Sequence, residues 1–308
     1  MNDRLTPPKV VCTGFATSDR VFSVERFADF AGVYHASESL QVDGGAAANA
    51  AISVAGLGGR SSFIGCVGDD EVGDRVLLRL AAAGVDIRGV QRVDKATPVR
   101  TVVQDAAGHR VVFAYVVDGF FDGCDLSPAA EIGDADAVLV DSRWTAGSAQ
   151  TLAAAHAAGV PAVAGINHPL RDDLADFLEL ATHVVFTCDA LMETVGVSDA
   201  HMALKELSRT TSAWVGVTKG PQGVSWIHQH GLQHQAAFEV GCDGAVAAGD
   251  VFRGAFALAL AEGRPADSAV LFATGAAAAK CRHNGASVDM PCRAEVEALL
   301  ASDPPFHL

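Results

Sequence analysis

The chain has 308 residues, half of them hydrophobic, and carries a formal net charge of −15 at pH 7. Such a length accommodates one large α/β domain, or one domain with a small appendage. The acidic charge argues against a nucleic-acid partner and an anionic membrane, because both need a basic face, and no apolar run reaches the roughly 20 residues of a membrane helix. The seven cysteines include no C-x-x-C pair. This predicts reduced thiols in a cytoplasmic protein, with no disulfide and no zinc site.

Short apolar runs rich in β-branched residues alternate along the chain with longer runs of helical character. The predicted strands are 9–15, 61–68, 136–142, 161–167, 183–187 and 213–218. The predicted helices are 46–59, 71–84 and 148–159, and the segment 250–281 is expected to be almost entirely helical. This alternation predicts an α/β fold with a mostly parallel sheet covered on both faces. Ligands in such folds bind at the carboxyl ends of the strands.

Two segments, 33–42 and 99–117, instead alternate polar and apolar residues with a period of two. The second would turn back on itself at 106–109 and form a hairpin. We expect both segments in one small β-lid, formed by about 16–43 and 98–118 and inserted in a single domain of residues 1–308. The alternative is that they extend one edge of the main sheet.

The run GAVAAGDVFRGAF, residues 244–256, places one carboxylate where an apolar helix is predicted to begin. Ala247, Ala248 and Gly249 are small enough for a ligand to approach the backbone. The first N–H groups of a helix have no partner within it, and with the helix dipole they would form an anion site. Asp250 could take a proton from a hydroxyl that attacks a phosphate held there, or it could simply cap the helix.

Three further stretches carry candidate ligand contacts. In DGGAAANAA, Gly44 and Gly45 would let a polyol lie against the backbone while Asn49 hydrogen-bonds a hydroxyl. The alternative there is a tight turn with a buried asparagine. Asp19 follows the first predicted strand and could accept two sugar hydroxyls, or it could be a turn aspartate. In VTKGPQG, at 217–223, a strand runs into a glycine turn.

Taken in order, GGAAANAA, FIGCVGDDEVG, VTKGPQG and AAGDVFRGAFALAL resemble the motifs of the ribokinase, or PfkB, family of carbohydrate kinases over nearly the whole chain. The resemblance implies a ribokinase-like three-layer α/β/α sandwich with a mostly parallel central sheet and a small β-sheet lid. It also implies a phosphotransferase with an alcohol acceptor that uses ATP and Mg²⁺. Its partners would be a small-molecule sugar and ATP, and relatives often pair their lids to form a homodimer.

The resemblance also implies roles for individual residues. Asp250 matches the catalytic base, and Ala247, Ala248 and Gly249 match the anion hole around the transferring phosphoryl group. The matches to sugar contacts are Asp19, Gly44, Gly45 and Asn49. The matches to the nucleotide site are Thr218, Gly220 and Gly223 of the glycine turn, with Asn284 and Gly285 near the adenine.

A closer likeness is to the sulfofructose kinase branch of the family, and it rests on DSRW, QHQAAF and AAGDVFRGA. In that branch an arginine at the position of Arg143 helps to hold the sulfonate. A structural salt bridge is the alternative for this residue. The branch also extends a lysine and an asparagine from its lid, where this chain has Val33 and Ala114. A neutral sugar, or another acid held mainly by Arg143, therefore fits better than sulfofructose.

Two motifs depart from the family pattern. The first aspartate of its D-T-x-G-A-G-D run is Gly244 here, which argues against activation by a monovalent cation. Its N-x-x-E motif, which orders water around Mg²⁺, falls on residues 187–190, where Asp189 would have to replace the glutamate. The segment HQHGLQH contains three histidines, His228, His230 and His234, that could be read as a metal cluster. The segment looks more like a surface hairpin, so no metal-ligating residue is predicted.

These features predict an ATP-dependent sugar kinase that phosphorylates a primary hydroxyl of a ketose or related furanose, with Asp250 as the general base. Two alternatives stay open. A nucleoside kinase of the same family would use Trp144 and the apolar lid to hold a nucleobase. A weakly catalytic sugar- or nucleotide-binding protein would account for the altered 244–246 run and the missing N-x-x-E motif.

Overall fold

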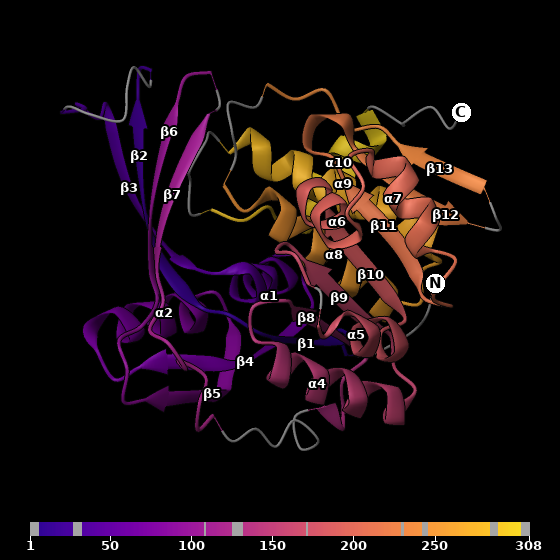
Figure 1. The fold of residues 1–308 in the computed structure, drawn as a ribbon, viewed down its shortest axis with the longest axis horizontal. Helices are drawn as coiled ribbons and strands as arrows, with labels where there is room; N and C mark the ends of the chain where they lie inside the picture. The colour runs from indigo at the N-terminus through magenta and orange to yellow at the C-terminus, as the bar shows by residue number, and fades with distance from the viewer. Residues whose placement is uncertain are drawn as a thin grey trace.

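The computed structural model describes residues 6–26, 33–107, 109–124, 132–170, 172–228, 231–241, 246–283 and 289–302. They form a nine-stranded sheet with helices on both faces (Figure 1), in the order β13-β12-β11-β10-β9-β8-β1-β4-β5. Its strands are β1 (Lys9–Thr13), β4 (Arg60–Gly68), β5 (Val85–Val93), β8 (Ala137–Asp141), β9 (Ala162–Ile166), β10 (His183–Thr187), β11 (Trp214–Thr218), β12 (Val224–His228) and β13 (Gly231–Gln235). The predicted α/β fold with a mostly parallel central sheet is confirmed.

The central strands are apolar on both sides because helices cover both faces of the sheet. β1 (KVVCT) and β8 (AVLVD) are buried at every residue and pair in parallel with each other. At one edge, β12 and β13 form an antiparallel hairpin. At the other edge, β5 has no counterpart among the predicted strands, because its sequence VDIRGVQRV mixes charged and apolar residues and is only partly buried. Polar edge strands carry a weak sequence signal.

The helices make up the two outer layers of the sandwich. They are α1 (Ala46–Gly56), α2 (Glu71–Ala82), α4 (Thr145–Ala158), α5 (Leu174–Leu180), α6 (Cys188–Val195), α7 (Ala200–Leu207), α8 (Ala248–Ala261), α9 (Ala266–Arg282) and α10 (Arg293–Ser302). One apolar core joins the sheet to α1, α2, α8 and α9, and a second joins it to α4, α5, α6 and α7. The segment 250–281 is almost entirely helical, as expected, and it is divided between α8 and α9, because α9 starts after Pro265. Within the described ranges, no helix has the length and apolar character needed to cross a membrane.

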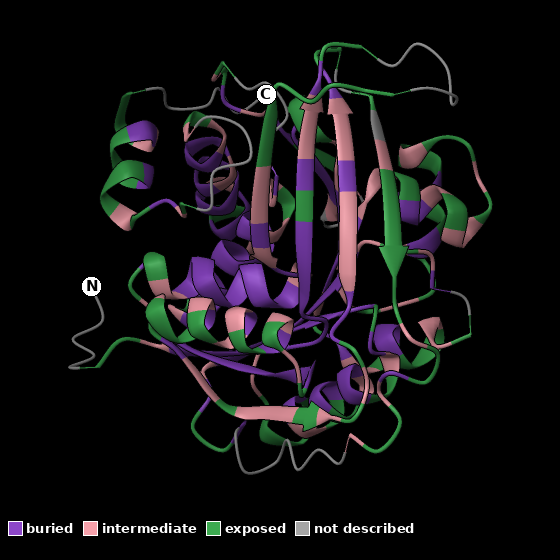
Figure 2. Cartoon of the chain, turned by 90° about the vertical axis from the view of Figure 1, so that its left-hand side faces the viewer, coloured by how far each residue is buried: buried purple, intermediate pink, exposed green. Residues whose placement is uncertain are grey.

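A separate four-stranded sheet, which we call the lid, stands beside the main sheet in the order β3-β2-β6-β7 (Figures 1 and 2). Its strands are β2 (Thr17–Val24), β3 (Glu38–Gly44), β6 (Val99–Asp105) and β7 (Arg110–Tyr115). β2 pairs in parallel with β6, whereas the pairs β2–β3 and β6–β7 are antiparallel. Because these strands form a sheet of their own, the alternative of an edge extension is wrong.

The strands of the lid differ in burial, as Figure 2 shows for the mostly exposed β7. On the inner side, Val21, Val42 and Val102 are buried and pack against Val246, in the loop that leads into α8. On β7, apolar side chains face solvent, and Phe113 is 65% exposed. The lid therefore contacts the start of α8 on one side and presents an apolar surface at its free edge.

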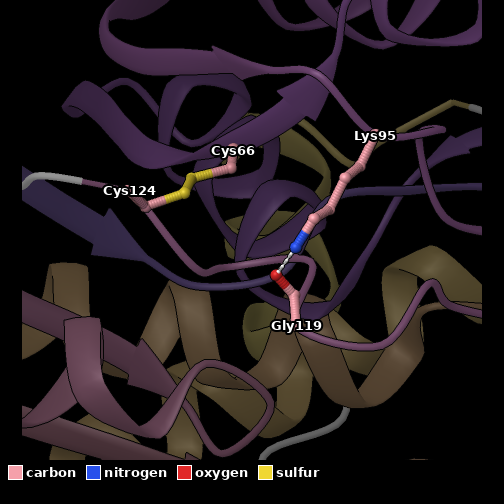
Figure 3. Close-up of a disulfide and its surroundings, with 4 residues drawn as sticks. All are labelled: Cys66, Lys95, Gly119 and Cys124. Carbon is pink, nitrogen blue, oxygen red and sulfur yellow. Dashed lines mark hydrogen bonds between the residues drawn. A yellow bond between two sulfur atoms is a disulfide. The ribbon is translucent and has the colours of Figure 1, made fainter.

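Cys66 in β4 and Cys124 are joined by a disulfide (Figure 3). The prediction that all cysteines are reduced thiols is therefore wrong. It relied on C-x-x-C spacing, which cannot detect partners separated by 58 residues. The bridge fastens the segment before Cys124 to the central sheet, and Lys95 Nζ donates a hydrogen bond to the carbonyl oxygen of Gly119 in the same segment.

Candidate active site

Helix α8 begins at Ala248, and Asp250 lies in its first turn. Ala247 precedes the helix with φ of 68°, the only positive φ of a non-glycine residue in the described part of the chain. The incoming loop thus ends in a left-handed residue, and the N–H groups of Ala248 and Gly249 have no partner inside the helix. No side chain caps this end of α8. The alternative in which Asp250 is a helix cap is therefore wrong.

The Asp250 carboxylate turns toward two neighbours. Its Oδ2 accepts a hydrogen bond from Asn49 Nδ2 at 3.0 Å, and its Oδ1 accepts one from Arg253 Nη1 at 3.0 Å. Burial raises the pKa of Asp250, while Arg253, the Asn49 hydrogen bond and the nearby Arg100 act in the opposite direction. The side chain remains 17% exposed. Since each carboxylate oxygen accepts two hydrogen bonds, both oxygens can still accept a substrate hydroxyl.

Asn49 reaches Asp250 from the first turn of α1, where two glycines make room. Gly45 precedes α1 with φ of 107°, and a Cβ on it would lie 2.3 Å from the carbonyl oxygen of Phe15. A Cβ on Gly44 would lie 2.2 Å from Asn49 Oδ1. The two glycines therefore shape a tight turn around the buried Asn49, and this turn places Asn49 against Asp250.

Asp19 lies within strand β2 of the lid, so the alternative of a turn aspartate is wrong. The side chain is buried, and Arg100 of the neighbouring β6 donates to both of its oxygens, from Nε to Oδ1 at 2.8 Å and from Nη2 to Oδ2. The two residues face each other in the parallel register of the lid. Arg100 was absent from the predicted site because local sequence does not reveal which strands of a lid become neighbours.

Arg143 follows β8 directly after Ser142 and lies near the lid's arginine. Its backbone N–H donates to the buried carboxylate of Asp141 at 2.9 Å, which fixes the loop at the end of β8. The residue as a whole is exposed, and its guanidinium makes no hydrogen bond or ion pair with any other described residue. Partial burial and the proximity of Arg100 lower the pKa of Arg143, and Asp141 raises it. The salt-bridge alternative for this side chain finds no partner in the described ranges.

A cavity of about 720 Å³ opens on the other side of the start of α8. Thr218, Gly220 and Gly223 line it from the turn after β11, and Ala248 and Gly249 line it from α8. The structure thus brings together the predicted nucleotide turn and the predicted anion hole. The predicted residues that fall outside the described ranges are Gly244, Asn284 and Gly285.

The carboxylate of Asp189 stands in the first turn of α6, just beyond the end of β10. It is exposed and has no hydrogen-bonding partner among the described residues. β10 ends beside the nucleotide turn, because Thr187 pairs with Thr218 across the two parallel strands. An exposed carboxylate therefore follows a strand whose neighbour, β11, leads into the cavity at Thr218, and a carboxylate is a group that suits the water shell of a hard cation such as Mg²⁺.

The histidine-rich hairpin is only partly described. His234 Nδ1 lies 3.1 Å from Ser225 Oγ, whereas His230 and the side chain of His228 lie outside the described residues. No group of three His, Cys, Asp or Glu residues that could bind a metal occurs within the described part of the chain.

The first turn of α8 therefore separates two environments. The backbone of Ala248 and Gly249 faces the cavity, and the carboxylate of Asp250 faces the polar groups of α1 and the lid. Such an arrangement can hold an anion at the helix N-terminus and place a general base on the opposite side of it.

The sequence matches known proteins along most of its length. The model of the "pfkB family carbohydrate kinase" family matches residues 7–293. Ribokinase of Bacillus subtilis is 31% identical over 274 residues, which cover 84% of this chain and 88% of that protein. Fructokinase of Escherichia coli is 28% identical over 285 residues, which cover 84% of this chain and 92% of that protein.

Comparison with solved structures also finds ribokinases. A protein of Agrobacterium tumefaciens provisionally named a ribokinase is 32% identical, with a TM-score of 0.90 over 96% of this chain and 98% of that chain. Arabidopsis thaliana ribokinase, solved with ribose and ATP, has a TM-score of 0.79 at 23% identity over 96% and 99% of the two chains, which supports the fold alone. The chain belongs to the pfkB family of carbohydrate kinases, which are phosphotransferases with an alcohol group as acceptor.

Proposed function

We propose that this protein is an ATP-dependent sugar kinase that phosphorylates a primary hydroxyl of a ketose or related furanose, with Asp250 as the general base. The observation that carries the proposal is the division made by the first turn of α8. Ala248 and Gly249 line the cavity there, and the Asp250 carboxylate faces the lid side. Phosphoryl transfer needs this geometry, because the donor and the acceptor must approach the phosphorus from opposite sides.

In the proposed reaction, ATP occupies the cavity beside Thr218, Gly220 and Gly223, and its γ-phosphate lies at the N–H groups of Ala248 and Gly249. The acceptor hydroxyl attacks the γ-phosphorus while its proton passes to Asp250, and ADP leaves with the former bridging oxygen. Mg²⁺ bound to ATP supplies neutralisation of the phosphate charge. The exposed carboxylate of Asp189 is the group that would orient its water shell.

On the acceptor side, we propose that Asp19, Asn49 and Arg143 contact the sugar. Both Asp19 oxygens are already bonded to Arg100, so acceptor hydroxyls would meet a rigid ion pair. The Arg143 guanidinium is the cation of this group without a partner in the described chain. It is therefore the group best able to select an acidic or strongly polar substituent on the sugar.

The nucleoside kinase alternative gains little from Trp144. Phe121 stacks on its indole at 5.1 Å between ring centroids, and a Cβ on Gly147 would lie 2.5 Å from the ring. The side chain is only 4% exposed. A nucleobase therefore has no open indole face on which to stack.

The first test is an ADP-release assay with Mg²⁺–ATP and each of D-fructose, D-ribose, sulfofructose and adenosine. We expect turnover with at least one sugar and a phosphomonoester on its primary carbon, detected by ³¹P NMR. Turnover with adenosine alone would replace the proposal with a nucleoside kinase. Thermal stabilisation by a sugar without any turnover would favour a binding protein instead.

We further propose that the lid forms a homodimer through its free edge. β7 ends the lid sheet, and its Phe113 and Tyr115 are 65% and 59% exposed, an unusual exposure for aromatic side chains on an unpaired edge strand. Sedimentation velocity at micromolar concentration should give twice the 31.7 kDa mass of the chain. Replacing Phe113 with lysine should shift the protein to monomer. A wild-type monomer at this concentration would rule the dimer out.

A further inference from the structure

Helix α8 is apolar over most of its length, yet it buries one arginine. Arg253 is 4% exposed and lies one turn after Asp250, to which its Nη1 donates at 3.0 Å. Its neighbours along the helix, Val251, Phe252 and Phe256, belong to the hydrophobic core. A guanidinium is almost never buried in such surroundings unless it is paired, because the loss of hydration must be compensated.

The main sheet is shaped to receive this arginine. Gly165 in β9 lies directly against it, and a Cβ on Gly165 would lie 2.5 Å from Arg253 Cδ and 3.1 Å from its Nε. The Nε is buried and has no hydrogen-bond partner within the described part of the chain. A buried donor without a partner lowers stability, so the fold retains this side chain despite its cost.

The charged groups that face the pair come from several elements. Asp141 at the end of β8 and Arg100 of the lid both act on Asp250. From α1 the pair receives the neutral amide of Asn49, and β9 contributes no titratable side chain. Along α9, Lys280 directs its Nζ to the carbonyl oxygen of Asp289.

On β1, Lys9 lies at the far end and pairs with Asp134, and the Cys12 thiol has its pKa raised by burial, so it is neutral. Within the described chain, Arg253 is therefore the cation in direct contact with Asp250.

We propose that Arg253 is a positioning residue for phosphoryl transfer: it holds the Asp250 carboxylate ionised and fixes its direction, and Gly165 fixes Arg253. The inference rests on the proposed role of Asp250 as the base. Asn49 and Arg253 each hold one carboxylate oxygen, so the carboxylate cannot rotate without breaking a contact. The remaining lone pairs then point in set directions, which suits a base that must meet one hydroxyl.

The sign of the electrostatic effect follows from the two opposing influences on Asp250. Burial raises its pKa, and Arg253 is the first of the groups that lower it. Without Arg253, the effect of burial would be opposed less, so the pKa of Asp250 would rise and the carboxylate would bind a proton at higher pH. A protonated carboxyl cannot accept the substrate proton. The acid limb of the kcat/KM profile should therefore move to higher pH when Arg253 loses its charge.

The direct test is the ¹³C chemical shift of the Asp250 carboxyl, followed against pH by NMR with labelled aspartate and assigned by its absence in Asp250→Asn. We expect Arg253→Gln to raise the titration midpoint by about one to three pH units and Arg253→Lys to restore most of the difference. An unchanged midpoint in Arg253→Gln would overturn the proposal. No substrate is needed, so the result is independent of the kinase assignment.

A second variant acts on the same pair without removing a charge. Gly165→Ala places a methyl group against Arg253 Cδ, so it should displace the guanidinium and raise the midpoint by a smaller amount. Arg88→Gln is the matched control, because the Arg88 side chain is 80% exposed and pairs with Asp86 on the edge strand β5. It should leave the Asp250 titration unchanged. If Arg253→Gln does not fold, an unchanged midpoint in Gly165→Ala would overturn the proposal.

Kinetic measurements distinguish the proposed role of Arg253 from the proposed sugar kinase activity. With a sugar that wild type phosphorylates, Arg253→Gln should lose kcat/KM at low pH and recover it as the pH rises. An equal loss at every pH would assign Arg253 a purely structural role. Absence of sugar-dependent ADP release from wild type would count against the proposed function, while the NMR titration would still decide whether Arg253 controls Asp250.

Discussion

Asp250→Asn should lower kcat by about 10²–10⁴-fold on any sugar that the wild-type protein phosphorylates. The amide has the same shape as the carboxylate but cannot take the proton of the attacking hydroxyl. The loss should not be recovered at any pH, since the amide does not titrate in the working range. Steady-state ADP release with saturating ATP and sugar measures this effect directly.

The variant also leaves Arg253 buried beside a neutral group, so its melting temperature should fall. Circular dichroism and the Kd for ATP are therefore needed to show that the loss of rate is not a loss of fold. Asp86→Asn removes a carboxylate from the exposed pair with Arg88 and should keep full activity. Near-wild-type turnover in Asp250→Asn would remove Asp250 from the role of base and with it the proposed mechanism.

Gly249→Ala should lower kcat by about 10²–10³-fold, the loss expected when a backbone donor can no longer reach the transferring group. In the protein without ligands, a Cβ on Gly249 would have no atom within 4 Å, and the residue has no positive φ. The fold should therefore accept the methyl group. The same methyl group would project from the α8 turn that lines the cavity, where the γ-phosphate is proposed to lie.

Gly241→Ala provides the comparison, because this glycine also lines the cavity and also has free space around a Cβ. It is not part of the proposed anion site at the start of α8, so Gly241→Ala should raise the KM for ATP with little effect on kcat. The two variants together distinguish crowding of the nucleotide from loss of the anion site. A Gly249→Ala protein with wild-type kcat would show that the backbone there does not touch the reacting phosphate.

The sequence alone predicted those parts of the site whose residues lie close together along the chain. The small residues before Asp250 and the apolar run after it predict a helix start with an exposed backbone, and α8 begins there. Gly45 and Asn49 lie four residues apart, so their joint position at the start of α1 also follows from local spacing.

The partners of these residues were harder to predict. Arg100 meets Asp19 only because β2 and β6 become neighbours in the lid, and no local pattern specifies that pairing. Arg253 is different, since Asp250 and Arg253 are three residues apart on one helix face, a spacing at which side chains meet. Two charged residues at this spacing in an otherwise apolar helix could have been used to predict the contact between Asp250 and Arg253. The disulfide between Cys66 and Cys124 joins distant segments and had no such signal.

Val246 packs beneath the lid, and this contact resists movement of the lid away from the start of α8. If the lid swings outward, Val21, Val42 and Val102 lose their contact with the loop before α8 and meet water, at roughly 1.5–3 kcal/mol for each side chain that becomes fully exposed. This apolar contact thus favours the position that the lid has in this structure. Arg100 travels with the lid while Arg253 stays on α8. Opening would therefore take one of two positive charges away from Asp250, so the charge balance around the carboxylate depends on whether the entrance is open.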